Sequence, residues 1–208
     1  MSRKGYFIIK RAFDIIVSLF AILILSPIAL IVFLIVAVGD VKSTVLFKQE
    51  RIGKNASPFY IYKFRTMRAD AEESGPALCH CDGNGNPVDV RLTVCGRFLR
   101  RYHLDELPNF WNVLIGDMSL VGPRPERKYY VDKIMERNPR YAELFQIRPG
   151  LTSNATICNG YTDSMEKMLV RLDSDLQYMR EMSMTTDLLI IVKTVKYLTR
   201  ISTAKCIE

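Results

Sequence analysis

The stretch IIVSLFAILILSPIALIVFLIVAV occupies residues 15–38 and contains no charged side chain. A helix of about 20 apolar residues is long enough to cross the hydrocarbon core of a bilayer. A secretory signal peptide would have a shorter apolar region that ends at a small-residue cleavage site, whereas this run continues into more basic sequence. The stretch therefore predicts an N-terminal membrane helix.

Two features of this helix bear on whether it spans the membrane. Ser26-Pro27 lies at the middle of the run, and a proline inside a helix removes one backbone hydrogen bond and bends the axis. Basic residues also flank the run on both sides, and the positive-inside rule then favours the cytoplasm for both ends. These residues are Arg3, Lys4, Lys10 and Arg11 before the run and Lys42, Lys48 and Arg51 after it. A re-entrant helix-break-helix and an ordinary spanning helix with a tolerated proline are both compatible with this pattern.

The composition bounds the remainder of the chain. The protein has 208 residues, of which 49% are hydrophobic, and a formal net charge of +7. This length fits one domain behind the membrane segment, so we divide the chain into a membrane part, residues 1–42, and a second domain, residues 43–208. The basic balance indicates an anionic partner such as a phosphorylated small molecule, anionic lipid or nucleic acid. The five cysteines have no disulfide-framework spacing, which indicates reduced thiols in a cytosolic compartment.

Local patterns after the membrane segment predict a mostly helical α+β domain. Residues 45–47 and 59–62 are β-prone and enclose a Gly-Lys-Asn turn, which predicts a hairpin. Residues 70–90 are rich in Gly, Pro, Asn and Asp and predict a loop. Helices are expected over 92–101, from Asp105 to about 115, and over 126–146, 164–181 and 188–201. The last has lysines and an arginine at helical spacing in an apolar segment, which suits either a helix in the membrane interface or a surface helix packed on its own domain.

The segment RFLRRYHLDELPNFWNVLIGDMSLVGPRPE, residues 97–126, concentrates the residues that could perform chemistry. Asp105 and Glu106 are adjacent carboxylates at an expected helix start. One interpretation is structural, because Asp105 would cap the helix and Glu106 would favour its dipole. The other is functional, because a helix N-terminus and nearby arginines attract phosphate, and an ionised Asp can attack a charge-neutralised phosphorus.

Further basic residues stand in short segments with Pro, Gly or aromatic neighbours. Arginine matches phosphate geometry with two parallel hydrogen bonds, so each residue is a candidate phosphate contact. The candidates are Lys63 and Arg65 in YKFRTM, Arg100 before the acidic pair, Arg124 in GPRPE and Arg148 in RPG.

Taken in order, QERIGKNASPFYIYKFRTM (49–67), the segment 91–126 and RPGLT (148–152) follow a proline-broken apolar run. This arrangement resembles the bacterial sugar transferase family, the monotopic phosphoglycosyl transferases, from about residue 10 to about residue 197. The resemblance implies a helix that re-enters at Ser26-Pro27 with both ends cytoplasmic, and interfacial C-terminal helices. It also implies a bacterial inner-membrane location with the catalytic domain on the cytoplasmic face, and a first membrane step of glycoconjugate assembly.

The resemblance further implies a magnesium-dependent reaction in two steps. Asp105 would attack the sugar-linked phosphorus of a UDP-sugar and expel UMP, and polyprenol (undecaprenyl) phosphate would then take the phosphosugar from Asp105. Glu106 would bind Mg²⁺ with Asp105 or assist proton handling. The expected substrate-binding residues are Lys63, Arg65, Arg100, Arg124, Arg148 and, in DSDLQYM, Asp175.

The chain departs from the family pattern after Pro149-Gly150. Many members read close to PGITGWAQVNGR there, whereas this chain reads PGLTSNATICNGYT. The segment is expected to help shape the nucleotide-sugar site, so the sugar is left open. The loop at 70–90 is a second candidate for specificity or lid closure.

Three other functions are compatible with parts of the sequence. A non-enzymatic membrane adaptor would explain the charge and the apolar run, but not LDELP followed by GPRPE. A one-step glycosyltransferase would act without a covalent intermediate. Nucleic-acid binding is not expected, because much of the basic charge flanks the membrane segment or the acidic pair and no nucleic-acid motif is present. The sequence leaves the oligomeric state open.

Overall fold

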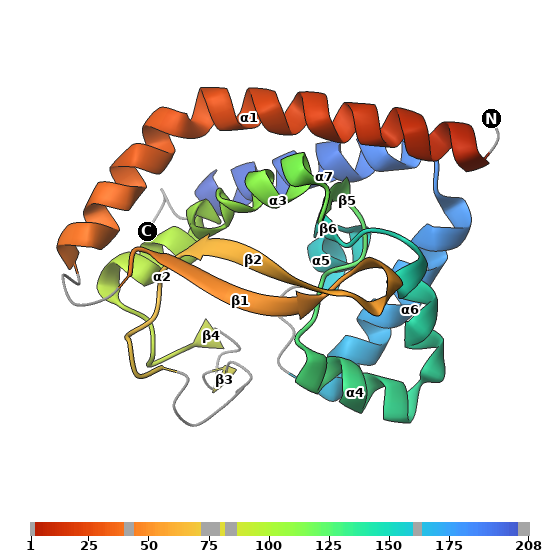
Figure 1. Cartoon of the computed structure of the whole chain (residues 1–208). Coiled ribbons are helices and arrows are strands. Elements are labelled where there is room, and N and C mark those ends of the chain that lie inside the picture. Colours follow the sequence, from red (N-terminus) through yellow and green to blue (C-terminus); the bar gives the residue numbers. More distant parts are fainter. Residues whose placement is uncertain (1–2, 40–43, 72–79, 82–86, 160–163, 204–208) are drawn as a thin grey trace.

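A long N-terminal helix lies over a mixed domain of short helices and short strands (Figure 1). This computed structural model describes residues 3–39, 44–71, 80–81, 87–159 and 164–203. Most of the described residues are helical and the strands form small two-stranded pairs. The predicted mostly helical α+β class is therefore confirmed. The boundary predicted between residues 42 and 43 falls within residues 40–43, which lie outside the described part.

Helix α1 (Arg3–Gly39) continues through Pro27 instead of stopping there. A proline cannot donate to the carbonyl four residues earlier, which here belongs to Leu23. The hydroxyl of Ser26 donates to this carbonyl at 2.9 Å and so satisfies it. Figure 1 shows the helix running over the domain and bending downward in its C-terminal third. The predicted helix-break-helix is thus a bent, uninterrupted helix, and its re-entry into a membrane stays a prediction.

Helix α1 is buried against the domain near its two ends only. In the first half the buried side chains are four residues apart and face one side: Tyr6, Lys10, Asp14 and Ser18. In the second half Val32 and Val36 pack with Phe64 and Leu99. No residue between 19 and 31 is buried, and many of the side chains there are large and apolar. Among the described residues, α1 is the one helix long and apolar enough to cross a membrane.

The predicted hairpin is confirmed and is longer than expected. Strand β1 (Leu46–Ile52) pairs antiparallel with β2 (Pro58–Phe64) over seven residues each, with Leu46 opposite Phe64. The 3-10 turn η1 (Lys54–Ala56) joins them, and Asn55 and Ala56 have positive φ angles. Figure 1 shows this ribbon crossing the middle of the molecule beneath α1.

The acidic pair lies in a short turn of its own, not at the first turn of an α-helix. Helix α2 (Val94–Arg101) begins after Thr93, whose side chain accepts from the backbone of Gly96. The 3-10 turn η2 (Leu104–Glu106) follows, and α3 (Asn109–Ile115) starts after Pro108 and ends at Gly116 with a φ of 100°. The expected end at Gly116 is confirmed. The expected start at Asp105 is wrong, because η2 and α3 are separate and neither has a side-chain cap.

A parallel pair of strands, which the sequence did not predict, joins two distant segments. Strand β5 (Ser119–Val121) pairs with β6 (Gly150–Thr152), and Gly150 donates to the carbonyl of Pro123 at 2.8 Å. A Cβ atom on Gly150 would lie 2.1 Å from the backbone nitrogen of Gly122. Glycine at this position therefore lets the two backbones approach, and brings GPRPE beside RPG.

The second half of the chain forms the helical side of the domain. The single helix expected over 126–146 is wrong, because α4 (Lys128–Arg137) ends at Asn138 and the 3-10 segment η3 (Pro139–Gln146) follows. Helix α5 (Asn154–Asn159) is short, α6 (Met165–Glu181) agrees with the helix expected over 164–181, and α7 (Met184–Thr203) includes the one expected over 188–201. The two-residue strands β3 (His80–Cys81) and β4 (Pro87–Val88) pair within the predicted loop.

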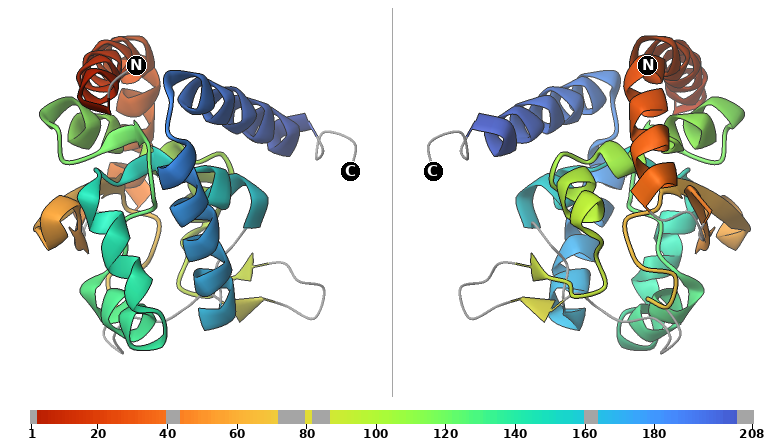
Figure 2. Two further views of the ribbon diagram at one scale, coloured as in Figure 1. Left: turned by 90° about the vertical axis from the view of Figure 1, so that its right-hand side faces the viewer. Right: turned by 90° about the vertical axis from the view of Figure 1, so that its left-hand side faces the viewer.

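Two larger clusters of buried apolar side chains hold these layers together. One joins β2, α3, β5, α6 and α7 beneath α1, with Val113 and Val121 almost fully buried. The other joins α4, η3 and α6, with Ile134 and Leu172 at its centre. The side views show α7 starting next to α1 and running away from it, while α6 leads from the start of α7 toward α4 at the opposite end of the domain (Figure 2).

Candidate active site

The two carboxylates of η2 meet basic side chains from different elements. Asp105 is 5% exposed. The ammonium of Lys63, near the end of β2, donates to Oε1 of Glu106 at 2.5 Å. Nη2 of Arg124 lies 3.8 Å from the same oxygen. The hairpin, the η2 turn and the GPRPE segment thus converge on one pair of acids.

The surroundings separate the two carboxylates electrostatically. Burial raises the pKa of Asp105, and the charge of Glu106 adds to the rise, while Lys63 and Arg100 oppose it. Burial acts the same way on Glu106, but there Lys63 and Arg124 outweigh it and lower the pKa to about 2. Neighbouring acids whose pKa values are pushed apart can take different roles. Glu106 is the permanent anion of the pair, and Asp105 is the more basic group and hence, once ionised, the stronger nucleophile.

Arg100, in the last turn of α2, is held close to Asp105 by contacts on two sides. Its Nε donates to the hydroxyl of Thr66 at 3.0 Å. Its Nη1 lies 3.8 Å from the carboxylate of Asp89. Its positive charge lowers the pKa of Asp105, so the structure brings this predicted residue to the acidic pair.

Asp175 lies behind the GPRPE segment and not beside Asp105. Its carboxylate accepts hydrogen bonds from Ser153 and from the backbone of Arg124, and burial raises its pKa to about 7. One of its oxygens, Oδ1, is buried without a hydrogen-bond partner among the described atoms. The structure thus connects Asp175 to the acidic pair indirectly, through the backbone of Arg124.

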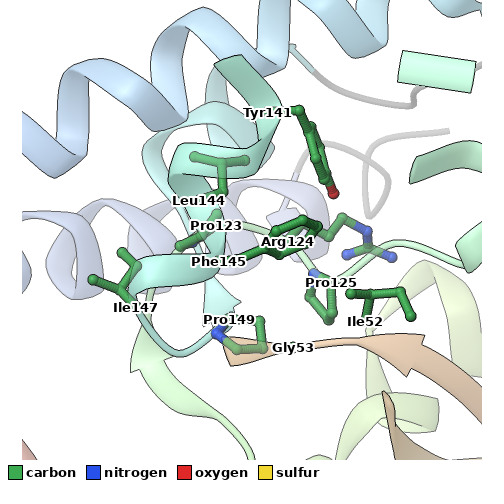
Figure 3. A pocket seen from close by; sticks show the side chains of 10 residues that line it. All are labelled: Ile52, Gly53, Pro123, Arg124, Pro125, Tyr141, Leu144, Phe145, Ile147 and Pro149. Carbon is green, nitrogen blue, oxygen red and sulfur yellow. The ribbon is translucent and has the colours of Figure 1, made fainter. Parts of the chain in front are cut away.

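Glu126 anchors the far end of the same segment. Its carboxylate pairs with Arg51 of β1 at 3.4 Å and with Arg171 of α6, and all three side chains are largely buried. A small hollow borders the segment (Figure 3). It is lined by Ile52, Gly53, Pro123, Arg124, Pro125, Tyr141, Leu144, Phe145, Ile147 and Pro149. GPRPE is therefore a rigid loop fixed from behind, with Arg124 extending toward Glu106.

Two predicted residues are engaged away from the acidic pair. Nε of Arg148 donates to the carbonyl of Gly116 at 2.7 Å, at the opposite end of α3 from η2. Arg11 of α1 donates to the last carbonyls of the same helix, so both arginines satisfy its C-terminal end. Nη2 of Arg65 donates to the hydroxyl of Thr44, before β1. Contact of Arg148 or Arg65 with a substrate stays a prediction.

Four residues that support the site were not among the predicted site residues: Thr66 and Asp89, which contact Arg100, and Arg51 and Arg171, which pair with Glu126. Thr66 and Arg51 stood within the quoted segment 49–67, and RTM after Lys63 was the available signal for Thr66. The sequence around Asp89 and Arg171 did not indicate a role at the site, because a single charged residue in a loop or on a helix resembles ordinary surface charge.

The donor set fits magnesium bound together with a substrate. Magnesium usually takes one or two protein carboxylates and completes its shell with water and substrate phosphates. Asp105 and Glu106 supply such a pair. Within the described residues no group of three or more His, Cys, Asp or Glu side chains could hold a metal ion by itself.

Comparison with known proteins identifies the class to which this fold and acidic pair belong. The family model described as bacterial sugar transferase matches residues 5–200. The chain therefore belongs to the bacterial sugar transferase family, which confirms the resemblance seen in the sequence.

Named relatives cover nearly the whole chain. It is 36% identical over 191 residues to the UDP-N-acetylgalactosamine-undecaprenyl-phosphate N-acetylgalactosaminephosphotransferase of Aeromonas hydrophila, covering 92% of this chain and 44% of the relative. It is 37% identical to the UDP-glucose:undecaprenyl-phosphate glucose-1-phosphate transferase of Escherichia coli, covering 90% of this chain and 39% of the relative. It is 41% identical to the exopolysaccharide production protein PSS of Rhizobium leguminosarum, covering 90% of this chain and 94% of the relative. The chain thus spans less than half the length of the first two relatives and nearly all of the third.

Proposed function

We propose that this chain transfers a sugar 1-phosphate from a UDP-sugar to a polyprenol phosphate such as undecaprenyl phosphate, through a phosphosugar bound covalently to Asp105. The observation that carries the proposal is a buried Asp105 beside Glu106, surrounded by the positive charges of Lys63, Arg100 and Arg124. Such charges neutralise the diphosphate of a nucleotide-sugar and allow an anionic nucleophile to approach it. Family membership and the names of the relatives support the same class of substrates.

The proposed reaction consists of two successive displacements at the sugar-linked phosphorus. In the first, an Asp105 oxygen forms a bond to the sugar-linked phosphorus, and the bond between this phosphorus and the bridging oxygen breaks. UMP leaves with that oxygen. In the second, an oxygen of the polyprenol phosphate attacks the same phosphorus, and the bond to Asp105 breaks. The products are UMP and a polyprenol diphosphate sugar, and the carboxylate of Asp105 is restored.

The other residues of the site act by charge and position. Lys63 and Arg124 keep Glu106 ionised and supply positive charge where phosphate oxygens would lie. Arg100 favours the ionised form of Asp105, which is the nucleophilic form. Asp105 and Glu106 would hold Mg²⁺ together with the substrate phosphates. The cation would supply further neutralisation of phosphate charge.

The membrane helix supports a re-entrant arrangement. The first half of α1 packs on α7 through the pair Lys10–Asp187 at 2.7 Å. The second half packs on β2 and α2 through Val32 and Val36. Because both ends contact one domain, an apolar middle that enters a bilayer would return to the same face. We propose that this face is the cytoplasmic face of the bacterial inner membrane, where UDP-sugars are available, and that the exposed apolar side of α7 lies in the interface.

The divergent segment after Pro149-Gly150 is our candidate for sugar selection. Ser153 bonds Thr156 and, through Asp175, reaches the backbone of Arg124. Asn154 accepts from Lys193 of α7 at 3.4 Å. Side-chain changes in this segment would therefore alter the wall behind the Arg124 loop. UDP-N-acetylgalactosamine and UDP-glucose are the first donors to compare, because relatives are named for them.

The decisive experiment measures the intact mass of the protein after mixing with UDP-sugar and magnesium in the absence of lipid. We expect UMP to be released in this first step and a phosphosugar to be added to Asp105, and this adduct should disappear when polyprenol phosphate is supplied. Asp105→Asn should bind the membrane normally and form no adduct. An active enzyme without any adduct, with ternary-complex kinetics, would establish direct one-step transfer instead. Normal UMP release by Asp105→Asn would refute the nucleophile assignment.

A further inference from the structure

Arg100 is restrained by two residues outside the acidic pair. Nε of Arg100 donates to the hydroxyl of Thr66 at 3.0 Å, and Nη1 of Arg100 lies 3.8 Å from the carboxylate of Asp89. These contacts fall on two different nitrogens of one planar group. A guanidinium held at two of its nitrogens cannot rotate about its stem without losing one contact.

Asp89 is itself firmly fixed. Its side chain is 3% exposed, and it accepts from Arg91 through Nε and Nη2, each at 2.7 Å, and through the backbone nitrogen at 3.1 Å. This two-pronged pairing sets the plane of the carboxylate. Asp89 therefore offers Arg100 a stationary negative charge at the border of the predicted loop 70–90.

Thr66 is fixed to both elements that form the site. Its carbonyl accepts from the backbone nitrogen of Thr93 at 3.0 Å, just before α2. A Cβ atom on Gly96 would lie 1.9 Å from the same carbonyl oxygen, so α2 touches this backbone directly. Lys63 lies three residues earlier in the same segment and pairs with Glu106. One short stretch thus presents Lys63 to Glu106 and the Thr66 hydroxyl to Arg100.

We propose that Thr66 and Asp89 are positioning residues for the transfer reaction, which hold the guanidinium of Arg100 in the orientation that faces Asp105 and the phosphate of the nucleotide-sugar. This inference rests on the proposed function and deepens it. An unrestrained arginine side chain on the edge of a site samples many rotamers, and ordering it during the reaction costs free energy. Thr66 and Asp89 supply that order in the folded protein before substrate binds.

The test is a pair of double-mutant cycles in the full-length, membrane-bound protein. Thr66→Val removes the hydroxyl and keeps the shape of the side chain, and Asp89→Asn removes the charge and keeps its size. Each is made in the wild-type and in the Arg100→Ala background. UMP release with UDP-sugar and polyprenol phosphate gives kcat and KM, and Thr194→Val and Asp132→Asn are the matched controls away from the site. The Thr194 hydroxyl bonds Thr152 and the Ile190 carbonyl, and Asp132 pairs with Lys128 on the surface.

We expect each variant to lower kcat/KM by about 10- to 100-fold in the wild-type background and by about twofold or less once Arg100 is alanine. Non-additivity of this kind identifies residues that act through a shared partner. If Arg100→Ala is too slow to follow, Arg100→Lys, which keeps a charge and lacks the Nε donor, serves as the background. If Asp89→Asn does not fold, the cycle with Thr66→Val still tests the inference.

Equal losses in both backgrounds would mean that Thr66 and Asp89 only support the fold, and would overturn the inference. Normal activity of both variants in the wild-type background would overturn it as well. Failure of the proposed function would give a different result from failure of the positioning roles. In that case the wild-type protein would form no UMP with any donor. An active wild-type protein with additive losses therefore refutes the positioning roles alone.

Discussion

Replacing Lys63 by methionine removes the closest positive charge of the acidic pair and keeps the length of the side chain. Lys63 lies 2.5 Å from Oε1 of Glu106, and Arg124 lies 3.8 Å from the same atom. Burial raises the pKa of Glu106, but these two cations lower it from 4.5 to about 2. That difference corresponds to roughly 3 kcal/mol in favour of the ionised acid. Lys63 is the nearer cation, so we expect it to account for about 2 kcal/mol.

A loss of about 2 kcal/mol in the transition state corresponds to about a 30-fold fall in kcat/KM at neutral pH. The pH profile should change as well. Asp105 has a raised pKa because it is buried, and Lys63 opposes that rise. Without Lys63 the pKa of Asp105 rises further, so a larger fraction is protonated and cannot attack phosphorus. The acidic limb of the rate profile should therefore move to higher pH.

The assay is UMP release in membranes between about pH 5 and pH 9, with protein amount fixed by immunoblot. Lys133→Met is the matched control, because Lys133 is exposed on α4 and its ammonium donates to the hydroxyl of Tyr129 at 2.6 Å, away from the acidic pair. It should keep the wild-type rate and profile. A Lys63→Met enzyme with an unmoved acidic limb and less than a threefold loss in rate would refute the electrostatic assignment of the site.

Three further predictions concern stability and can be measured in detergent. Gly96→Ala should lower the free energy of unfolding by about 3 kcal/mol, because the added Cβ would lie 1.9 Å from a carbonyl oxygen. Gly39→Ala should be neutral in thermal melts, because none of the described atoms outside its own stretch of helix lies within 4 Å of the added Cβ. Asp175 has a pKa raised from 3.8 to about 7 by burial, so the folded state binds more protons than the unfolded state and stability should fall by about 4 kcal/mol as pH rises from about 4 to 7. Asp175→Asn should abolish that fall, and a wild-type curve that is flat over this range would contradict the assignment. Lys10→Met should cost about 3–5 kcal/mol in denaturant unfolding, because it leaves Asp187 buried without its cation. The hydroxyls of Tyr6 and Tyr178 also donate to the Asp187 carboxylate, at 2.9 and 2.7 Å, and a loss below 1 kcal/mol would show that these two hydrogen bonds suffice.

Local sequence patterns predicted an element correctly wherever neighbouring residues alone determine its structure. The hairpin followed from two β-prone runs around a turn, and the end of α3 followed from Gly116, which adopts the positive φ that glycine tolerates. The patterns failed where two elements lie end to end. Residues 126–146 read as one helix, yet Asn138 adopts an extended conformation before Pro139 and the helix ends there.

The candidate site shows the same division. Asp105, Glu106, Lys63, Arg100 and Arg124 stood in recognisable segments, and the structure brings them together. Arg148 stood in an equally suggestive segment, yet its Nε caps the end of α3. Sequence spacing alone cannot separate these cases, because a guanidinium binds a helix carbonyl as readily as a phosphate.

What the sequence determined by itself is the chemistry available: an uncharged apolar run long enough to cross a membrane, with a proline at its middle, an Asp-Glu pair, and basic residues in segments typical of one family. Only the tertiary structure decided how this chemistry is arranged. It bends α1 without interrupting it, buries Asp105 while keeping Glu106 ionised, and places Thr66 and Asp89 against Arg100. The physical reason is that burial and charge proximity depend on contacts between segments far apart in the chain, which no local pattern encodes.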